Sequence, residues 1–82
     1  MQTVEVNYDK ENDVLYISIK SGIPSYVEED VPGILIRKSL DSNILTGITI
    51  LDFRKRLYDS SIFSINLPVD IDFKSINDSL IH

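Results

Sequence analysis

Three residues of the chain, Asp13, Tyr16 and Asp52, have side chains suited to proton transfer. A carboxylate near a phenol can move protons when burial shifts the pKa values of both groups. A small enzyme or ligand-binding protein that uses these three residues is therefore one hypothesis. The preferred interpretation is structural: Asp13 starts a strand through a bond to the backbone, Tyr16 packs across strands, and Asp52 caps a helix.

Acidic residues stand at alternate positions in Asp9, Glu11 and Asp13, as ligands do in a calcium-binding loop. Val14 occupies the place of the glycine that such a loop requires, and its distal bidentate glutamate is missing. Turn bonds that close a hairpin explain the pattern better. The chain has no cysteine and a single histidine, His82, so a zinc site or a catalytic triad lacks its partners. We expect no metal, no cofactor and no catalytic residue.

A basic cluster is the remaining candidate site, because it could contact phosphates or an acidic protein. Its members are Arg37, Lys38, Arg54, Lys55 and Arg56. They converge only if the segment carrying the last three folds back near the strand carrying the first two. Basic residues on a solvated face are the commoner arrangement, and a formal net charge of −5 argues against nucleic acid. Nucleic-acid contact through this cluster is the second alternative.

Alternation of apolar and polar residues predicts a first β-hairpin. Residues 4–8 form one strand and residues 15–19 the other, joined by the five polar residues 9–13. Since neighbouring side chains of a strand point to opposite faces, the core side of the second strand is expected to carry Leu15, Ile17 and Ile19.

A second hairpin is predicted from residues 34–36 and residues 46–51, joined by a loop at 40–43. Ile48 and Ile50 then share one face, and Gly47 indicates a bulge or a close backbone approach. A short edge strand is expected over residues 25–28, before the turn formed by Pro32 and Gly33.

After the second hairpin, a short helix is expected over residues 53–58, with Asp52 as its N-cap. The alternation of Phe63, Ile65 and Leu67 predicts a further strand that ends at Pro68, and Val69, Ile71 and Phe73 continue the alternation after it. A terminal helical turn is expected to start at Asp72 or Ser75. The fold class is thus α+β: a small antiparallel sheet of two consecutive hairpins, with four or five strands, one short helix and a C-terminal strand or turn.

Eighty-two residues, 43% of them hydrophobic, are typical of one globular domain over residues 1–82. A limited core without disulfides gains from self-association, so a homodimer is expected. No stretch has the roughly 18 apolar residues that a membrane helix needs. The N-terminus has no signal-peptide pattern, and the cytoplasm is the expected location.

Several motifs resemble those of DUF2283, a family of small uncharacterised bacterial and archaeal proteins. The first is Tyr8-Asp9 followed by residues 13–17, Asp-Val-Leu-Tyr-Ile; the second is residues 32–36, Pro-Gly-Ile-Leu-Ile. The third is residues 47–52, Gly-Ile-Thr-Ile-Leu-Asp, before a basic segment. The resemblance implies a core over about residues 3–58 with a C-terminal extension over 59–82, and it implies no established activity. The matching motif residues are Tyr8, Asp9, Asp13, Leu15, Tyr16, Gly33, Gly47 and Asp52.

The chain departs from this family pattern at two places. Thr49 stands where members usually carry an acidic residue, and residues 41–43, Asp-Ser-Asn, replace a turn that often holds a glycine. Both differences are compatible with the fold. The function we expect is that of a non-catalytic binding or regulatory module, acting through a sheet face or edge, in a homodimer or with a small operon-encoded protein.

Overall fold

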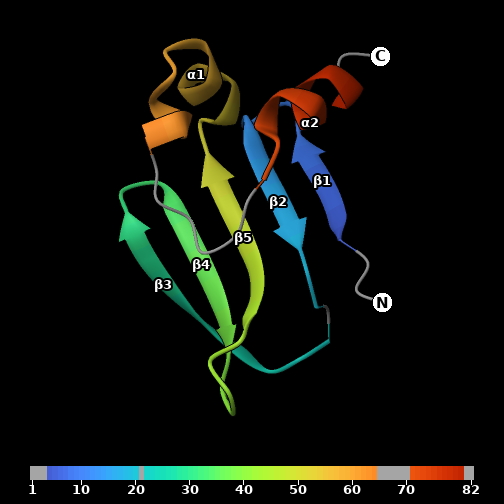
Figure 1. The fold of residues 1–82 in the computed structure, drawn as a ribbon, viewed down its shortest axis with the longest axis vertical. Coiled ribbons are helices and arrows are strands. Elements are labelled where there is room, and N and C mark those ends of the chain that lie inside the picture. The colour runs from blue at the N-terminus through green and yellow to red at the C-terminus, as the bar shows by residue number, and fades with distance from the viewer. Residues whose placement is uncertain (1–3, 21, 65–70, 81–82) are drawn as a thin grey trace.

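A five-stranded antiparallel sheet forms the body of the computed structural model, which describes residues 4–20, 22–64 and 71–80. The strands are β1 (Glu5–Asp9), β2 (Val14–Ser18), β3 (Ser25–Val31), β4 (Ile34–Ser39) and β5 (Leu45–Leu51). They lie in the order β1-β2-β5-β4-β3 (Figure 1). The two predicted hairpins are β1–β2 and β4–β5, and β5 joins them by pairing with both β2 and β4.

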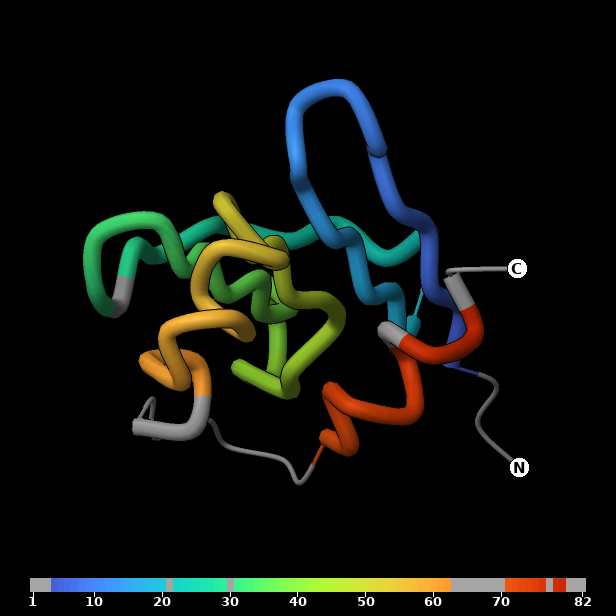
Figure 2. Tube along the Cα trace, turned by 90° about the horizontal axis from the view of Figure 1, so that it is seen from above, coloured from blue at the N-terminus to red at the C-terminus, as the bar shows by residue number. Residues whose placement is uncertain are grey.

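The helices in the described part of the chain cover one face of this sheet. They are α1 (Phe53–Tyr58), the 3-10 helix η1 (Ser61–Ser64) and α2 (Phe73–Leu80). Seen from above, η1 and α2 lie on one side of the strands (Figure 2), and α1 contributes Phe53 to the same core as they do. The helix predicted over residues 53–58 is confirmed, and no helix in the described part of the chain is long and apolar enough to cross a membrane.

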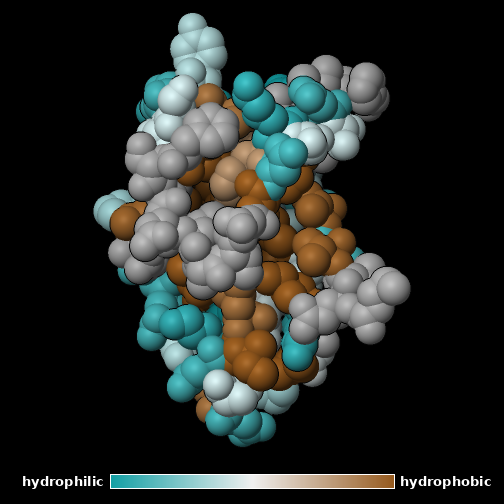
Figure 3. Space-filling model, in the orientation of Figure 1, coloured by the Kyte–Doolittle hydropathy of each residue, from teal (hydrophilic) through white to brown (hydrophobic). Residues whose placement is uncertain are grey.

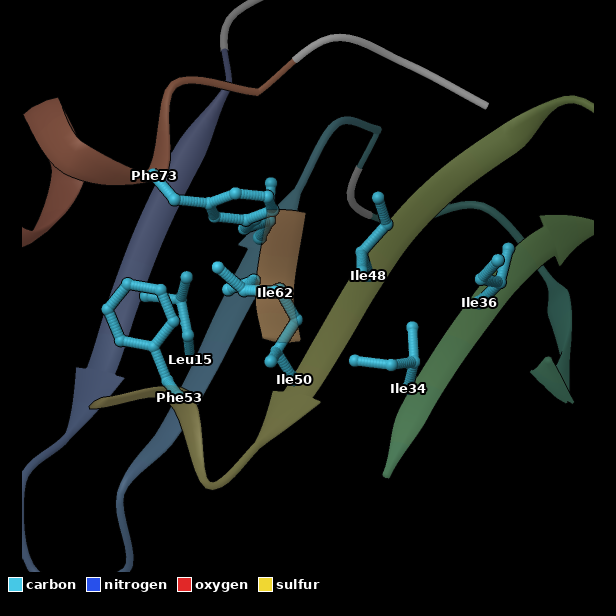
Figure 4. Close-up of a cluster of buried hydrophobic side chains, with 9 residues drawn as sticks. Leu15, Ile34, Ile36, Ile48, Ile50, Phe53, Ile62 and Phe73 are labelled. Atoms are coloured by element: carbon cyan, nitrogen blue, oxygen red, sulfur yellow. The ribbon is translucent and has the colours of Figure 1, made fainter. Parts of the chain in front are cut away.

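The core fills the space between this face and the helices. Two residues from each of three neighbouring strands, β2, β5 and β4, point into it: Leu15, Ile17, Ile48, Ile50, Ile34 and Ile36. Phe53, Ile62 and Phe73 close it from α1, η1 and α2 (Figure 4). Burying such a side chain fully contributes about 1.5–3 kcal/mol, so these nine residues supply most of the stabilisation. Since Ile62 and Phe73 follow residue 58, the C-terminal extension completes the core.

Both core predictions for the hairpins hold, with one difference. Leu15 and Ile17 are buried, whereas Ile19 lies half-buried against the cluster. Apolar residues also remain visible at the surface on the helix-bearing side, bordered by polar ones (Figure 3). The opposite face of the sheet lies behind the molecule in that view.

Strand β3 is longer than the four residues expected and occupies the edge as predicted. Its pairing with β4 shifts between Glu29 and Val31, so an extra residue bends this edge. A second bulge lies opposite Arg37 and Lys38, where β5 inserts Thr46. The Thr46 carbonyl oxygen accepts bonds from the backbone N–H groups of residues 19 and 20, at 2.9 and 3.0 Å. Gly47 therefore adjoins a bulge, as predicted.

The prediction of a strand after residue 62 is wrong where the structure describes it. Phe63 and Ser64 belong to η1, and Phe73 begins α2; the predicted positions 65–70 lie outside the described residues. The carboxylate of Asp72 accepts bonds from the Ser75 backbone N–H at 3.0 Å and the Ser75 hydroxyl at 2.9 Å. These bonds lower the pKa of Asp72 and cap α2, so the predicted helix start at Asp72 is confirmed.

Candidate functional site

Asp13 joins the first hairpin to α1. Its carboxylate accepts bonds from the Arg54 backbone N–H, at 2.9 and 3.1 Å, and from the Lys55 backbone N–H at 3.4 Å. Its own carbonyl oxygen accepts the N–H of Phe53 at 3.0 Å. Three N–H groups at the start of α1, which have no partner within the helix, are thus bound by one residue 40 to 42 positions earlier in the chain. We call this arrangement the Asp13 clasp.

Asp52 does not cap α1, so that prediction is wrong. The residue occupies the N-cap position but has φ 55° and makes no side-chain bond to the helix. Its left-handed backbone turns the chain from β5 into α1, and Asp tolerates this conformation better than most residues. Asp13 takes over the capping because the end of the hairpin places its carboxylate against the first turn of α1.

Tyr8 completes the clasp from β1. Its hydroxyl donates to Asp13 Oδ1 at 2.6 Å, its ring meets that of Phe53 edge-on at 6.0 Å, and the Arg54 guanidinium lies 5.9 Å from the ring centroid. Burial of the phenol, followed by the bond to Asp13 and the negative charge of Asp13, raises the pKa of Tyr8 to about 12. The phenol is therefore a hydrogen-bond donor at neutral pH, and both carboxylate oxygens of Asp13 are occupied.

Asp9 has a turn-forming role. Its carboxylate accepts bonds from the Asn12 side chain at 2.8 Å and from the backbone N–H groups of Glu11 and Asn12, at 3.1 and 3.3 Å. The Asn12 side-chain bond, followed by that from its backbone, lowers the pKa of Asp9. No group of three or more His, Cys, Asp or Glu residues able to hold a metal ion occurs among the described residues. The turn interpretation of the acidic motif therefore accounts for Asp9.

The structure does not bring Asp13, Tyr16 and Asp52 together. Asp13 is held against α1, whereas Tyr16 alternates with the core residues Leu15 and Ile17 and points to the other face of the sheet. Asp52 lines a small polar depression that opens to solvent; the other lining residues are Lys55, Arg56, Asp59 and Ser61. This arrangement offers no shared pocket for proton transfer.

The basic residues are also separated. Lys38 forms an ion pair with Glu28 at 3.5 Å, and Arg54 lies over Tyr8. Arg56 donates from Nε to the Leu51 carbonyl oxygen at 2.9 Å and from Nη2 to that of Pro32. Lys55 faces the depression.

Arg37 lies apart from the other four, across Gly47 on the opposite face of the sheet. A Cβ at Gly47 would stand 2.5 Å from Arg37 Nη2. The sequence pattern therefore indicated a basic patch that the fold does not assemble.

Gly33 serves the contact that Arg56 makes with the turn between β3 and β4. Its φ of 88° is a left-handed conformation that favours glycine, and a side chain here would collide with the Arg56 guanidinium. The arginine thereby ties α1 to this turn, as Asp13 ties it to the β1–β2 turn. Sequence reasoning missed this use of Arg56, because a cation near the end of a helix already has a simple explanation in the helix dipole.

We call the side of the sheet away from the helices the open face. Residues paired across antiparallel strands share a face, so the register identifies its rows. The middle row, from β1 to β3, is Asn7, Tyr16, Thr49, Leu35 and Glu29. The row on one side of it is Glu5, Ser18, Gly47, Arg37 and Val27. On the other side lie Asp9, Val14 and Leu51.

Apolar side chains are spread over the open face, from β2 to the edge strand β3. Tyr16 is 43% exposed, Val27 58% and Leu51 36%, while Leu35 and Thr49 are half-buried. Among residues 4–20, 22–64 and 71–80, the helices pack their apolar side chains into the core on the other face of the sheet. Sequence reasoning missed Val27 and Leu35 as surface candidates. The available signal was the unbroken apolar run at residues 34–36, which is typical of strands covered on both faces.

The fold and these contacts define a small α+β domain: one antiparallel sheet with helices packed on a single face. The chain belongs to DUF2283, a family described as a protein of unknown function, whose model matches residues 5–54. The match runs from β1 into the first turn of α1, and it therefore includes every residue of the Asp13 clasp except Lys55. No curated protein and no solved structure matches the chain.

Proposed function

We propose that this chain is a non-catalytic binding module that contacts another protein through the open face of its sheet. The observation that carries the proposal is the set of exposed apolar residues on that face: Tyr16 and Leu51 on the neighbouring strands β2 and β5, and Val27 on the edge strand β3. An antiparallel sheet with one solvated face normally alternates apolar and polar residues. Here β2 and β4 are apolar on both faces, at residues 14–17 and 34–36. Such strands gain stability when the second face is also covered.

The sheet edges are less suited to recruiting a partner. Edge strand β3 carries Glu28 and Glu29 beside a bulge, and Pro32 follows it. Charge, bulges and proline are the features that discourage pairing between edge strands. The other edge, β1, is only five residues long. The open face, rather than an edge, is therefore the favoured contact surface.

The contacts of Asp13 and Tyr8 support a non-catalytic role. A general base needs a lone pair directed at a substrate, whereas both oxygens of this carboxylate accept bonds from the protein itself. In this proposal the family motif builds the fold, and the open face makes the contacts. The partner class is a second copy of the chain or a small operon-encoded protein, and the location is the cytoplasm.

Photo-crosslinking in the native cells tests the proposal. A photoreactive phenylalanine derivative at position 16 or 35 places the probe on the open face, and the same residue at Tyr58, 93% exposed on α1, is the control. We expect discrete protein adducts from positions 16 and 35 and none from position 58. Adducts of equal yield from all three positions, or none from the open face, would contradict the proposal. Mass spectrometry of the adduct identifies the partner.

A further inference from the structure

We infer that the occupant of the open face is a second copy of this chain, placed by a two-fold axis that runs along β5 and passes over Thr49. The inference rests on the proposed function, because it takes the open face as the binding surface. The juxtaposition that carries it is an apolar centre with carboxylates at both margins and one cation between them. The carboxylates are those of Glu5 and Asp9 on β1 and Glu29 on β3; the cation is Arg37 on β4.

Two sheets that meet face to face through a two-fold axis can be related in two simple ways. An axis perpendicular to the strands places each strand over itself. Glu29 then faces Glu29 of the partner subunit, and Glu5 faces Asp9 of the partner subunit, because the rows on either side of Thr49 exchange places. Like charges opposed in this way are destabilising. This orientation is therefore disfavoured.

An axis along β5 reverses the strand order and keeps each row in place. β1 then lies over β3 of the partner subunit, so Glu29 faces Asn7 of the partner subunit, an amide that can donate to it. Tyr16 faces Leu35 of the partner subunit, and this contact occurs twice by symmetry. In the two rows that have a residue from all five strands, the middle row and the row from Glu5 to Val27, no carboxylate faces another carboxylate. Charge and apolar complementarity thus select this axis.

Arg37 supplies the ionic contact in this orientation. It lies opposite Ser18 of the partner subunit and one strand away from Glu5 of the partner subunit. Within the described part of the chain, its guanidinium has no hydrogen-bond or ion-pair partner, and it lies across Gly47. On association it turns from Gly47 toward that glutamate. Such a pair links the two subunits twice, once on each side of the axis.

The size of the open face sets the strength of the dimer. Five strands about 4.8 Å apart and three rows about 6.7 Å apart give a surface on the order of 500 Å² per subunit. A standard stable interface buries about 800 Å² per partner, so this dimer is weak and concentration-dependent. We expect it to form at roughly 100 µM of purified chain and to dissociate on dilution.

Charge reversal tests the pairing. Sedimentation equilibrium of the full chain between about 10 and 500 µM is measured for the wild type, Arg37→Glu, Glu5→Arg and the double variant. Each single variant is expected to weaken the dimer at least about tenfold, and the double variant to restore it to within about threefold. Lys74→Glu, an exposed charge reversal on α2, is the matched control and leaves the dimer unchanged. Circular dichroism confirms that every variant is folded.

The opposite results overturn the inference. They are a wild-type chain that stays monomeric up to 500 µM, a dimer that neither single variant weakens, or a double variant that fails to restore it. The crosslinks described above separate this failure from failure of the proposed function. If the probe at position 16 crosslinks to a different protein while the purified chain stays monomeric, the binding module is supported and the homodimer is refuted.

Discussion

Asp13 and Asp52 offer a controlled test of the clasp, because both have φ 55° and only the side chain of Asp13 binds the helix. Asparagine tolerates this backbone conformation as aspartate does, so Asp→Asn at either position leaves the backbone preference in place. At Asp13, however, the substitution removes the charge and replaces one acceptor oxygen by an NH₂ donor. That donor faces the N–H groups of Arg54 and Lys55 if the amide oxygen keeps the Tyr8 bond.

The expected cost follows from these lost bonds. Removing a capping acceptor costs about 0.5–2 kcal/mol, and a hydrogen bond to a charged group contributes about 1.5–3 kcal/mol. Since the amide oxygen retains part of the contact, Asp13→Asn should lower the free energy of unfolding by about 1–2 kcal/mol. For a domain of this size that corresponds to a fall in Tm of roughly 5–15 °C. Asp52→Asn should change the free energy of unfolding by less than about 0.5 kcal/mol.

Urea and thermal unfolding followed by circular dichroism measure both variants under one set of conditions. Equal slopes of the urea transitions show that the two substitutions act on the same folding equilibrium. If Asp52→Asn destabilises the domain as much as Asp13→Asn does, the assignment of the cap to Asp13 is refuted.

Three further predictions concern neighbouring contacts. Tyr8→Phe removes the bond to Asp13 and should cost about 1 kcal/mol in urea unfolding. The folded-state pKa of Tyr8 is raised to about 12, so the phenol contributes fully to the free energy of unfolding below pH 10 and loses this contribution as the pH rises through 12. Wild type and Tyr8→Phe should therefore converge in stability over that interval. Gly33→Ala should lower the free energy of unfolding by about 1–2 kcal/mol, because of the positive φ and the displaced Arg56. Adding Arg56→Ala to this variant should recover only the part of the loss that the collision causes. Full recovery would show that the backbone conformation contributes nothing. Phe53→Ala should cost about 3–5 kcal/mol, enough to leave much of so small a domain unfolded at 37 °C; a cooperative transition close to that of the wild type would contradict the central place of this ring in the core.

Local patterns were sufficient to predict the hairpins. Alternation identified the buried positions of β2 and β5, and the break at Pro32 and Gly33 marked the turn before β4. The short helix was also predicted correctly from residues 53–58. These features depend on side-chain direction along a strand and on turn conformations, both of which are properties of short segments.

Contacts between distant segments could not be predicted in the same way. The cap of α1 comes from Asp13, although Asp52 is the residue that the local pattern indicates. At the C-terminal end, alternation of apolar residues predicted a strand where η1 and α2 pack a few apolar side chains onto an existing core. Contacts with the sheet surface, rather than alternation along a strand, decide which side chains are buried in this segment. The uncovered face could be identified only once the strand order was known.

The position of β5 has a consequence for the order in which the domain assembles. Strands β3, β4 and β5 succeed one another in the chain and pair as neighbours, and so do β1 and β2, whereas the ladder between β2 and β5 joins residues that are 29 to 37 positions apart. Closing the loop between β2 and β5 is the step with the largest entropic cost. The β1–β2 hairpin and strands β3 and β4 therefore cannot be joined in one sheet until residues 45–51 have emerged from the ribosome. The native topology is therefore established late, when β2 pairs with β5. During refolding, the backbone amides of the β2–β5 ladder should be the last to become protected from hydrogen exchange.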